Sequence, residues 1–367
     1  MEQASMTRVI PSFTYSRVPG LLKAAPLWES YGFALAETRK TFRSMCVHRK
    51  AKSFRRVKCM ITADVDAATF PSFLPPEVME LRDINARALA SRIIRLPVQT
   101  KFSEKPIMTS CVKPTIMNNG FSPLLLLHGF DSSCLEWRNA YHKLEEANLE
   151  SWAFDVLGWG FSNSEDLASF GVEAKREHLY EFWKSYIRRP MVLVGASLGG
   201  AVAIDFTLAY PEVVSKLVLI NAQCYAEGTG KMATFPKLLA YAGVSILKSV
   251  FLRVYANTLV YYKVPWDRII DQMKIGRLHC FMPGWTSAAV DFMLSGGYNV
   301  ASCVSEVKKD TLIIWGKEDI ILEKDTPQKF MQDLPNAKVA YIDECGHLPH
   351  VEKPDNVVAL ISEFCST

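Results

Sequence analysis

Short runs of consecutive apolar residues recur along the chain, and this pattern restricts the fold more than any other feature. The runs are Leu124–Leu127, Trp152–Val156, Met191–Val194, Leu217–Ile220, Thr311–Trp315 and Lys338–Ile342. A strand that is apolar at every position is buried on both faces, as in a parallel sheet covered by helices. Residues 173–188 and 198–210 have the pattern of such helices. The sequence therefore predicts an α/β fold, with its chemistry in the loops at the carboxyl ends of the strands.

The stretch before the first clear run gives weaker signals. Apolar residues recur at helical spacing over residues 75–94, with Pro76 suited to a first turn, so we expect an amphipathic helix there. Residues 93–98 and 107–113 are expected to form the first strands of the sheet.

The third clear run ends in Gly195-Ala196-Ser197-Leu198-Gly199, and a helical segment follows directly. A nucleophile elbow needs this order of strand, tight turn and helix, because the serine stands at the tip of the turn. Gly195 and Gly199 leave room for neighbouring backbone to approach. The helix N-terminus behind Ser197 favours developing negative charge. We therefore predict that Ser197 is a catalytic nucleophile.

A serine nucleophile also requires donors that stabilise an oxyanion. His128-Gly129-Phe130 follows the first clear run, and we expect the backbone amide of Phe130 to be one donor. The amide of Leu198, directly after the nucleophile, is expected to be the other. Gly129 is expected to let the loop bend sharply, and His128 is interpreted as structural.

The expected base is His347, in the loop after the last apolar run. A base of this kind needs a carboxylate on its other ring nitrogen. Asp319 follows the preceding run and is the expected partner, with Glu318 and Asp343 as competitors. His350 is the rival base and is interpreted as a supporting or surface residue. The order nucleophile, acid, histidine matches the order found in α/β-hydrolases.

Together these motifs resemble the α/β-hydrolase superfamily over about residues 90–365. The segments that carry the resemblance are Leu127-His-Gly-Phe130, Asp155-Val-Leu-Gly-Trp-Gly-Phe-Ser162, the elbow, Trp315-Gly-Lys-Glu-Asp319 and Gly346-His347 with Glu352-Lys353-Pro354. The resemblance implies a serine hydrolase that cleaves a carboxylic ester through an acyl-enzyme, without cofactor or metal. Epoxide and haloalkane hydrolases of this fold use an Asp nucleophile, which Ser197 argues against.

Two alternatives remain open at this point. The chain could transfer the acyl group to an alcohol other than water, or it could be a ligand receptor that keeps a slow triad. A receptor would release one product and stall, so multiple turnover distinguishes it from an enzyme. No GxxxxGK[ST] or GxGxxG motif is present, which argues against nucleotide binding.

Residues 222–304 interrupt the pattern of strands and are too long for a loop, so we expect a helical cap. The predicted core is then made of residues 61–221 and 305–367. The cap is rich in large apolar residues, which pack onto the core or, in a second interpretation, form an acyl or prenyl tunnel beside a mildly basic, membrane-tolerant surface. No apolar run reaches the roughly 18–20 residues of a transmembrane helix.

The cap also carries a closer resemblance. Tyr225-Ala-Glu-Gly-Thr-Gly230, Ile275-Gly-Arg-Leu-His279 and Ser295-Gly-Gly-Tyr-Asn299 resemble a plastid group of plant α/β-hydrolases. The chain is similar to the prenyl-ester hydrolases linked to tocopherol synthesis and, more distantly, resembles chlorophyll dephytylase and pheophytinase. The resemblance implies a small apolar substrate, namely a long prenyl or phytyl ester, cleaved in the chloroplast.

Charge is distributed unevenly along the chain. Residues 1–60 contain twelve Lys or Arg and three acidic residues, which is +9 of formal charge in a protein whose total is +4. An Arg- and Ser-bearing segment poor in acids is typical of an organelle transit peptide. A basic nucleic-acid tail is the alternative, but no recognition motif accompanies it. We expect a chloroplast protein, with a mitochondrial location less favoured.

The nine cysteines are scattered, odd in number and form no CxxC. This pattern indicates reduced thiols and neither a disulfide framework nor a zinc site. Cys345, two residues before His347, is interpreted as packed near the site without a catalytic role.

Overall fold

The computed structural model describes residues 69–117, 120–163, 165 and 167–366. The predicted transit peptide over residues 1–60 lies outside the described residues.

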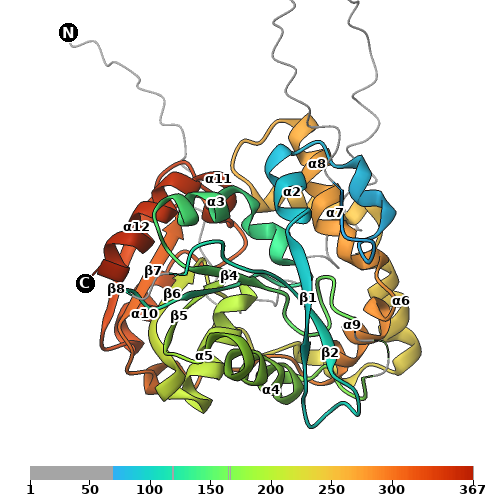
Figure 1. The fold of residues 1–367 in the computed structure, drawn as a ribbon, viewed down its shortest axis with the longest axis horizontal. Helices are drawn as coiled ribbons and strands as arrows, with labels where there is room; N and C mark the ends of the chain where they lie inside the picture. Colours follow the sequence, from blue (N-terminus) through green and yellow to red (C-terminus); the bar gives the residue numbers. More distant parts are fainter. Residues whose placement is uncertain (1–68, 118–119, 164, 166, 367) are drawn as a thin grey trace, which may run out of the picture.

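Eight strands form one sheet in the order β1-β2-β4-β3-β5-β6-β7-β8. The strands are β1 (Ile93–Val98), β2 (Ile107–Val112), β3 (Leu124–Leu127), β4 (Ser151–Phe154), β5 (Met191–Ala196), β6 (Val214–Ile220), β7 (Thr311–Gly316) and β8 (Ala337–Ile342). β1 pairs with β2, and β2 with β4, in antiparallel fashion, whereas all pairs from β4 to β8 are parallel. Figure 1 places β1 and β8 at opposite edges of the sheet. The predicted fold and both early strands are confirmed.

Alternate residues of each central strand enter two separate cores, because successive side chains point to opposite faces. Leu124 and Leu126 pack with α3 (Arg138–Glu146) and α12 (Pro354–Ser366) on one face. Leu125 and Leu127 pack with α4 (Val172–Phe182) and α5 (Leu198–Ala209) on the other. Figure 1 shows these two helical layers above and below the sheet. The apolar runs of the central strands are therefore explained by burial on both faces. The last run, Lys338–Ile342, does not fit this expectation, because β8 lies at the edge of the sheet and leaves Lys338 and Tyr341 exposed.

The expected helix over residues 75–94 is wrong in its extent. The segment divides into a 3-10 turn, η1 (Pro76–Glu80), and a short helix, α2 (Ile84–Ala90), before β1 begins. Leu81 is extended, and the Asp83 side chain accepts a hydrogen bond from the amide of Ala86 at 2.9 Å. Asp83 therefore caps a second helix and stops the first from continuing.

The remaining turns and helices of the core connect or flank the strands. They are η2 (Cys134–Trp137), the π-turn η3 (Trp183–Ile187), η4 (Pro211–Val213), η7 (Val304–Glu306), α10 (Thr326–Asp333) and α11 (Pro349–Glu352). α4 and η3 together occupy the segment predicted as one helix over residues 173–188.

The insert between β6 and β7 is helical, as predicted. It contains η5 (Gly230–Thr234), α6 (Lys237–Leu247), α7 (Val250–Val260), α8 (Trp266–Arg277), η6 (Leu278–Phe281) and α9 (Trp285–Leu294). Its helices lie together on one side of the sheet in Figure 1. Among the described residues no single helix meets the criteria for crossing a membrane, although α6 and α7, bent by 67° relative to each other, meet them as a pair.

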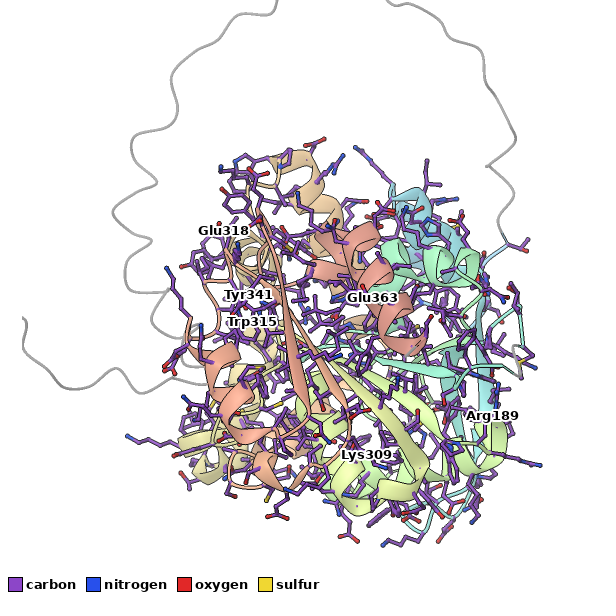
Figure 2. All side chains as sticks on the ribbon, turned by 90° about the vertical axis from the view of Figure 1, so that its left-hand side faces the viewer. Arg189, Lys309, Trp315, Glu318, Tyr341 and Glu363 are labelled. Atoms are coloured by element: carbon purple, nitrogen blue, oxygen red, sulfur yellow. The ribbon has the colours of Figure 1, made fainter. Side chains whose placement is uncertain are left out.

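The parallel strands bring their following loops to one end of the sheet. Figure 2 shows Lys309, which precedes β7, and Glu318, which follows it, at opposite ends of that strand, with Trp315 between them. The loops after β3, β5, β7 and β8 therefore meet at the same end, as expected for a site in this type of sheet.

Candidate active site

Ser197 stands between β5 and α5 in a backbone conformation that is unusual for serine, with φ of 50° and ψ of −120°. Such a conformation costs of order 1–3 kcal/mol and persists only where its surroundings enforce it. Here the amide of Ser197 donates to the carbonyl of Ile220 at 3.0 Å, and its carbonyl accepts from the amide of Gln223 at 2.9 Å. Pairing with β6 and the segment after it therefore holds the turn.

The glycines of the turn are required by close approach. A Cβ added to Gly195 would lie 2.3 Å from the carbonyl oxygen of Gly199, and one on Gly199 would lie 2.6 Å from that of Leu127. A Cβ on Gly200 would lie 2.4 Å from the Cβ of Ala222. The helix can therefore approach β3 and the chain after β6 only with glycine at these three positions.

The structure brings His347 and Asp319 to the serine. The Nε2 atom of His347 lies 2.9 Å from the Oγ of Ser197, and its Nδ1 lies 2.8 Å from the Oδ2 of Asp319. All three side chains are buried. Because an ionised carboxylate only accepts, Nδ1 carries the proton and Nε2 is left to accept from the serine hydroxyl.

Four donors hold the Asp319 carboxylate. Besides His347, the amides of Ile321 and Leu322 reach Oδ1 at 2.7 and 3.3 Å, and the side-chain amide of Asn221 reaches Oδ2 at 2.6 Å. Asn221 also accepts from the amide of Gly316 at 2.9 Å, so it links the end of β6 to the end of β7. Sequence reasoning missed Asn221, because its position directly after a strand is its only signal.

The electrostatic environment favours a charged acid and a basic histidine. Burial works to raise the pKa of Asp319, but the His347 charge and the hydrogen bonds outweigh it and lower that pKa. Burial likewise works to lower the pKa of His347, but the charge and hydrogen bond of Asp319 raise it above the usual 6.5. His347 is therefore a stronger base than free histidine.

Glu318, Asp343 and Cys345 do not take part in the hydrogen-bonded line from Asp319 to Ser197. Glu318 is exposed, and Asp343 forms an exposed ion pair with Lys317 at 2.5 Å. Cys345 is buried, and burial raises the pKa of its thiol, so it stays protonated and weakly nucleophilic.

Phe130 and Leu198 both line a cavity of about 620 Å³, a volume that includes its open mouth. Leu198 is the first residue of α5, so its amide has no partner within the helix. Gly129 does not have a left-handed backbone conformation, whereas Asp131, two residues later, adopts φ of 49°. A Cβ added to Gly129 would lie 3.3 Å from the Cβ of Ser197, a tight contact that would require Ser197 to shift by a few tenths of an ångström.

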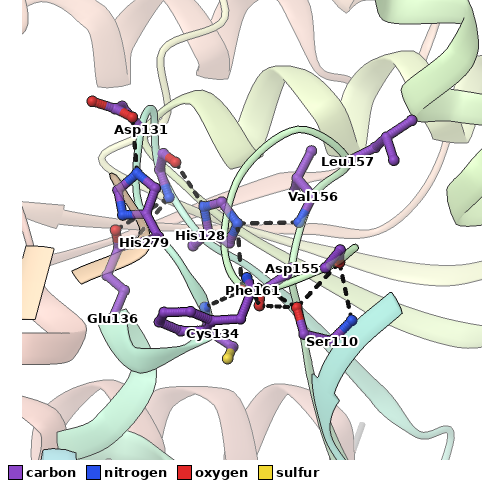
Figure 3. Close-up of polar contacts among 12 residues, drawn as sticks. Ser110, His128, Asp131, Cys134, Glu136, Asp155, Val156, Leu157, Phe161 and His279 are labelled. Carbon is purple, nitrogen blue, oxygen red and sulfur yellow. Dashed lines mark hydrogen bonds and ion pairs between the residues drawn. The ribbon is translucent and has the colours of Figure 1, made fainter. Parts of the chain in front are cut away.

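His128 supports the loop after β3 as a neutral ring. Its Nδ1 donates to the carbonyl of Gly129 at 2.8 Å, and its Nε2 accepts from the amide of Val156 at 3.1 Å. Burial lowers the pKa of His128. Figure 3 shows the ring directed at Val156, beside the Asp155 carboxylate that accepts from the amides of Cys134 and Phe161. His128 therefore joins the loops after β3 and β4 and does not face Ser197.

A second buried pair lies behind Gly129. The Glu136 carboxylate accepts from the Gly129 amide at 3.1 Å and bonds the Nε2 of His350 at 3.1 Å. The His350 ring packs 4.4 Å from the ring of Trp137, centroid to centroid. Burial works to raise the pKa of Glu136, but His350 and other neighbours lower it to about 2. His350 is thus a buried supporting residue and not a surface one. Sequence reasoning missed Glu136, because no motif or spacing singles it out.

The insert contacts the His347 loop through backbone. The amide of His347 donates to the carbonyl of Val260, at the end of α7, at 2.8 Å. The Glu352 carboxylate joins the amides of Tyr262 and Gly346 at 2.8 and 2.9 Å. A Cβ on Gly346 would lie 2.6 Å from the Val260 carbonyl oxygen, so this contact needs glycine.

The cavity lies between the loop after β3, the start of α5 and the insert. Its wall is mainly apolar, with Met232 and Leu247 from one part of the insert and Phe292 and Met293 from α9. The centre of the Phe130 ring lies 5.5 Å from that of the Trp159 ring and 6.4 Å from that of the Phe292 ring.

Comparison with known proteins decides the family. A model described as "Alpha/beta hydrolase family" matches residues 124–360, which include every element of the site described above. The chain belongs to the alpha/beta hydrolase family. This assignment agrees with the predicted superfamily and accounts for the sheet order and the turn at Ser197.

Relatives of this family range from near to distant. The alpha/beta hydrolase domain-containing protein VTE7 of Arabidopsis thaliana is 51% identical over 85% of this chain and 94% of its own length. Human monoacylglycerol lipase ABHD6 is 23% identical over 66% of this chain and 74% of its own length. A thermophilic esterase from Thermogutta terrifontis superposes with a TM-score of 0.62 at 20% identity, over 74% of this chain and 97% of its own. The last two similarities concern the fold.

Proposed function

We propose that this hydrolase cleaves a carboxylic ester, with Ser197, His347 and Asp319 as its catalytic triad. The observation that carries the proposal is the unbroken hydrogen-bonded line from Asp319 through His347 to Ser197, beside an apolar cavity. A hydroxyl is a poor nucleophile unless an adjacent base removes its proton, and His347 is placed to do this.

The geometry supports a two-step reaction. His347 takes the proton from Ser197 as its Oγ attacks the ester carbonyl, while the amides of Phe130 and Leu198 hold the oxyanion. His347 then gives the proton to the departing alcohol, which leaves an ester of Ser197. Water, deprotonated by His347, attacks this acyl-enzyme and releases the acid. Asp319 keeps the ring in the required tautomer and stabilises its charged form.

We further propose that the substrate is a long apolar ester of the prenyl or phytyl type. The mainly apolar wall of the cavity supports this, because an extended hydrocarbon chain gains by leaving water there. The similarity to a plant hydrolase and the basic composition of residues 1–60 support a chloroplast location in chlorophyll or tocopherol metabolism.

The test uses the full chain and a series of esters of one chromogenic alcohol with acyl chains of increasing length, together with phytyl and geranylgeranyl esters. We expect many turnovers per protein and kcat/KM that rises with chain length. Equal rates on acetate and long-chain esters would contradict the apolar substrate. A single product per protein would favour the slow receptor, and faster product formation with an added alcohol acceptor would favour acyl transfer.

We also propose that the insert docks on an anionic lipid surface. Apolar side chains on and beside α6 and α7 are exposed, including Leu238 at 82% and Phe251 at 53%. Lys237, which precedes Leu238 in α6, and Lys231 of η5 are exposed as well. Amphipathic helices with this combination bind membrane interfaces, where a prenyl ester would also be found.

Vesicles test the docking surface directly. The full chain should sediment with vesicles that contain an anionic lipid and less with neutral ones, and a Leu238→Ser/Phe251→Ser double variant should lose sedimentation while it keeps activity on a short soluble ester. Unchanged sedimentation of the variant would exclude this surface. A matched control is Ser245→Ala on α6.

A further inference from the structure

Asp131 directly follows Phe130 and has a left-handed backbone conformation, with φ of 49°. Its side chain is buried, and the residue lies in the loop after β3. A non-glycine residue with positive φ is uncommon, and such strain collects where surrounding contacts determine the backbone. The contacts of Asp131 come from the insert.

Three elements of the insert converge on the Asp131 carboxylate. His279 of η6 and Trp285 of α9 each contact Oδ1, through Nε2 and Nε1 respectively, at 2.8 Å, and Arg253 of α7 donates to Oδ2. Figure 3 shows the contact between Asp131 and His279. Arg253 also donates to the carbonyl of Gly276 at 2.8 Å. One side chain of the core thus joins α7, η6 and α9, and Arg253 extends the network to α8.

Asp131, His279 and Cys280 also carry atoms of the kind that bind metals, within 4.8 Å of one another. Arg253 argues against that interpretation, because its guanidinium donates to both Asp131 and Cys280 and cannot act as a ligand. A metal ion here would lie against a permanent positive charge. We therefore interpret the group as an ion-pair network.

The network has a counterpart on the other side of Phe130. Gly129 is held by the Glu136 carboxylate of the core, through its amide at 3.1 Å. Asp131 is held by the insert. The backbone on both sides of Phe130 is therefore tied to a buried carboxylate, which limits how the peptide plane between them can turn.

We propose that Asp131 is a positioning residue that directs the Phe130 amide toward the oxyanion, so that the oxyanion hole is complete only when the insert is seated on the core. This inference rests on the proposed function, because it takes Phe130 as an oxyanion donor. Loss of one such donor lowers kcat by about 10²–10³-fold in serine hydrolases, and small displacements have comparable effects.

The chain offers a matched control at the opposite end of the sheet. Glu150, just before β4, is buried, pairs with Arg189, and accepts from the indole nitrogen of Trp152 at 3.3 Å. Like Asp131, Glu150 is a buried carboxylate that is paired with an arginine and a tryptophan. Unlike Asp131, it does not contact the candidate active site. Figure 2 shows Arg189 away from Trp315 and Glu318, which mark the carboxyl end of β7.

The experiment compares Asp131→Asn and Glu150→Gln in the full chain. For Asp131→Asn we expect kcat to fall about 100-fold with KM within about threefold, and the pH midpoint of kcat/KM to stay unchanged because His347 and Asp319 are intact. Affinity for a trifluoromethyl ketone, which adds to Ser197 and places an oxyanion in the hole, should fall by a similar factor. Glu150→Gln should keep its kcat.

Equal losses of kcat in both variants, or a normal kcat in Asp131→Asn, would overturn the inference. If Asp131→Asn does not fold, Trp285→Phe removes one donor to Asp131 and keeps an aromatic ring at this position. This variant should lower kcat several-fold with the same KM. A normal kcat in Trp285→Phe would then overturn it. A wild-type protein inactive on every ester would instead refute the proposed function, which separates the two failures.

Discussion

β3, β5 and β7, which lead into the site, are buried at every position, whereas α6 and α7 of the insert turn several large apolar side chains outward. The core places Ser197, Asp319 and His347 at the ends of three parallel strands. The insert supplies most of the cavity wall and contacts the loops that hold Phe130 and His347. Under the proposed function, the core supplies the reacting groups, and the insert forms most of the wall that a substrate would contact.

The largest expected effect tests the core. Ser197→Ala removes the nucleophile and should lower kcat about 10⁶-fold, as loss of the serine does in other triads. Steady-state kinetics of the full chain measure the loss, and a thermal melt checks folding. The matched control is Ser245→Ala, an exposed serine on α6 of the insert. Retention of more than a trace of activity in a folded Ser197→Ala protein would refute the proposed nucleophile.

Asp319→Asn should lower kcat by about 10⁴-fold, because the wrong histidine tautomer is then favoured. The pH profile adds a second measurement. Activity needs neutral His347, so kcat/KM rises as pH increases through the pKa of His347, with a wild-type midpoint above 6.5. Without the Asp319 charge, burial lowers that pKa, and the midpoint should move to lower pH. Glu318→Gln is the adjacent control, and a shared midpoint would contradict the assignment of Asp319.

A smaller effect tests the insert. Ala289 of α9 lines the cavity, and Ala289→Leu should shorten the longest chain that is accepted. One or two methylenes change specificity by about 10–200-fold, so long esters should lose that factor relative to short ones. Ser287→Leu, exposed on the same helix, is the control. Equal losses of kcat/KM on esters of all chain lengths would show that Ala289 affects the reaction itself and not the choice of substrate.

The smallest effect concerns the boundary between the two regions. Lys175 of α4 is buried, with its Nζ 4.0 Å from the centre of the Trp159 ring and 4.9 Å from that of Phe292 of the insert. Burial lowers the pKa of Lys175 to about 7, below the ~10.4 of an unfolded lysine. The unfolded chain therefore binds more protons between those values, and stability rises with pH in that window.

Lys175→Met should remove this contribution. Urea unfolding at pH 7, 8 and 9 should show a smaller rise of stability with pH in the variant than in the wild type. The exposed Lys184→Met is the control, and it should keep the wild-type slope. Identical slopes for all three proteins would mean that Lys175 is not buried in solution.

The sequence supported the fold and the proximity of Ser197, Asp319 and His347 because each lies in the turn or loop that follows a parallel strand, where chain order alone indicates neighbours in space. Asn221 also follows a strand, but nothing in the sequence shows that its side chain reaches Asp319. Glu136 and Asp131 depend on contacts with His350 and with the insert, over separations of more than a hundred residues. Such pairings are fixed by packing and leave no local pattern.

The hydrogen bond from the His347 amide to the Val260 carbonyl has a consequence for how such an enzyme diversifies. An exchange of the insert for that of another hydrolase changes the wall of the cavity and the support of the His347 loop in one step. A chimera has to restore the pairing of residues 260–262 with Gly346, His347 and Glu352 before any new specificity can be seen. Gradual substitution within the cavity is therefore the easier route to new substrates for this chain.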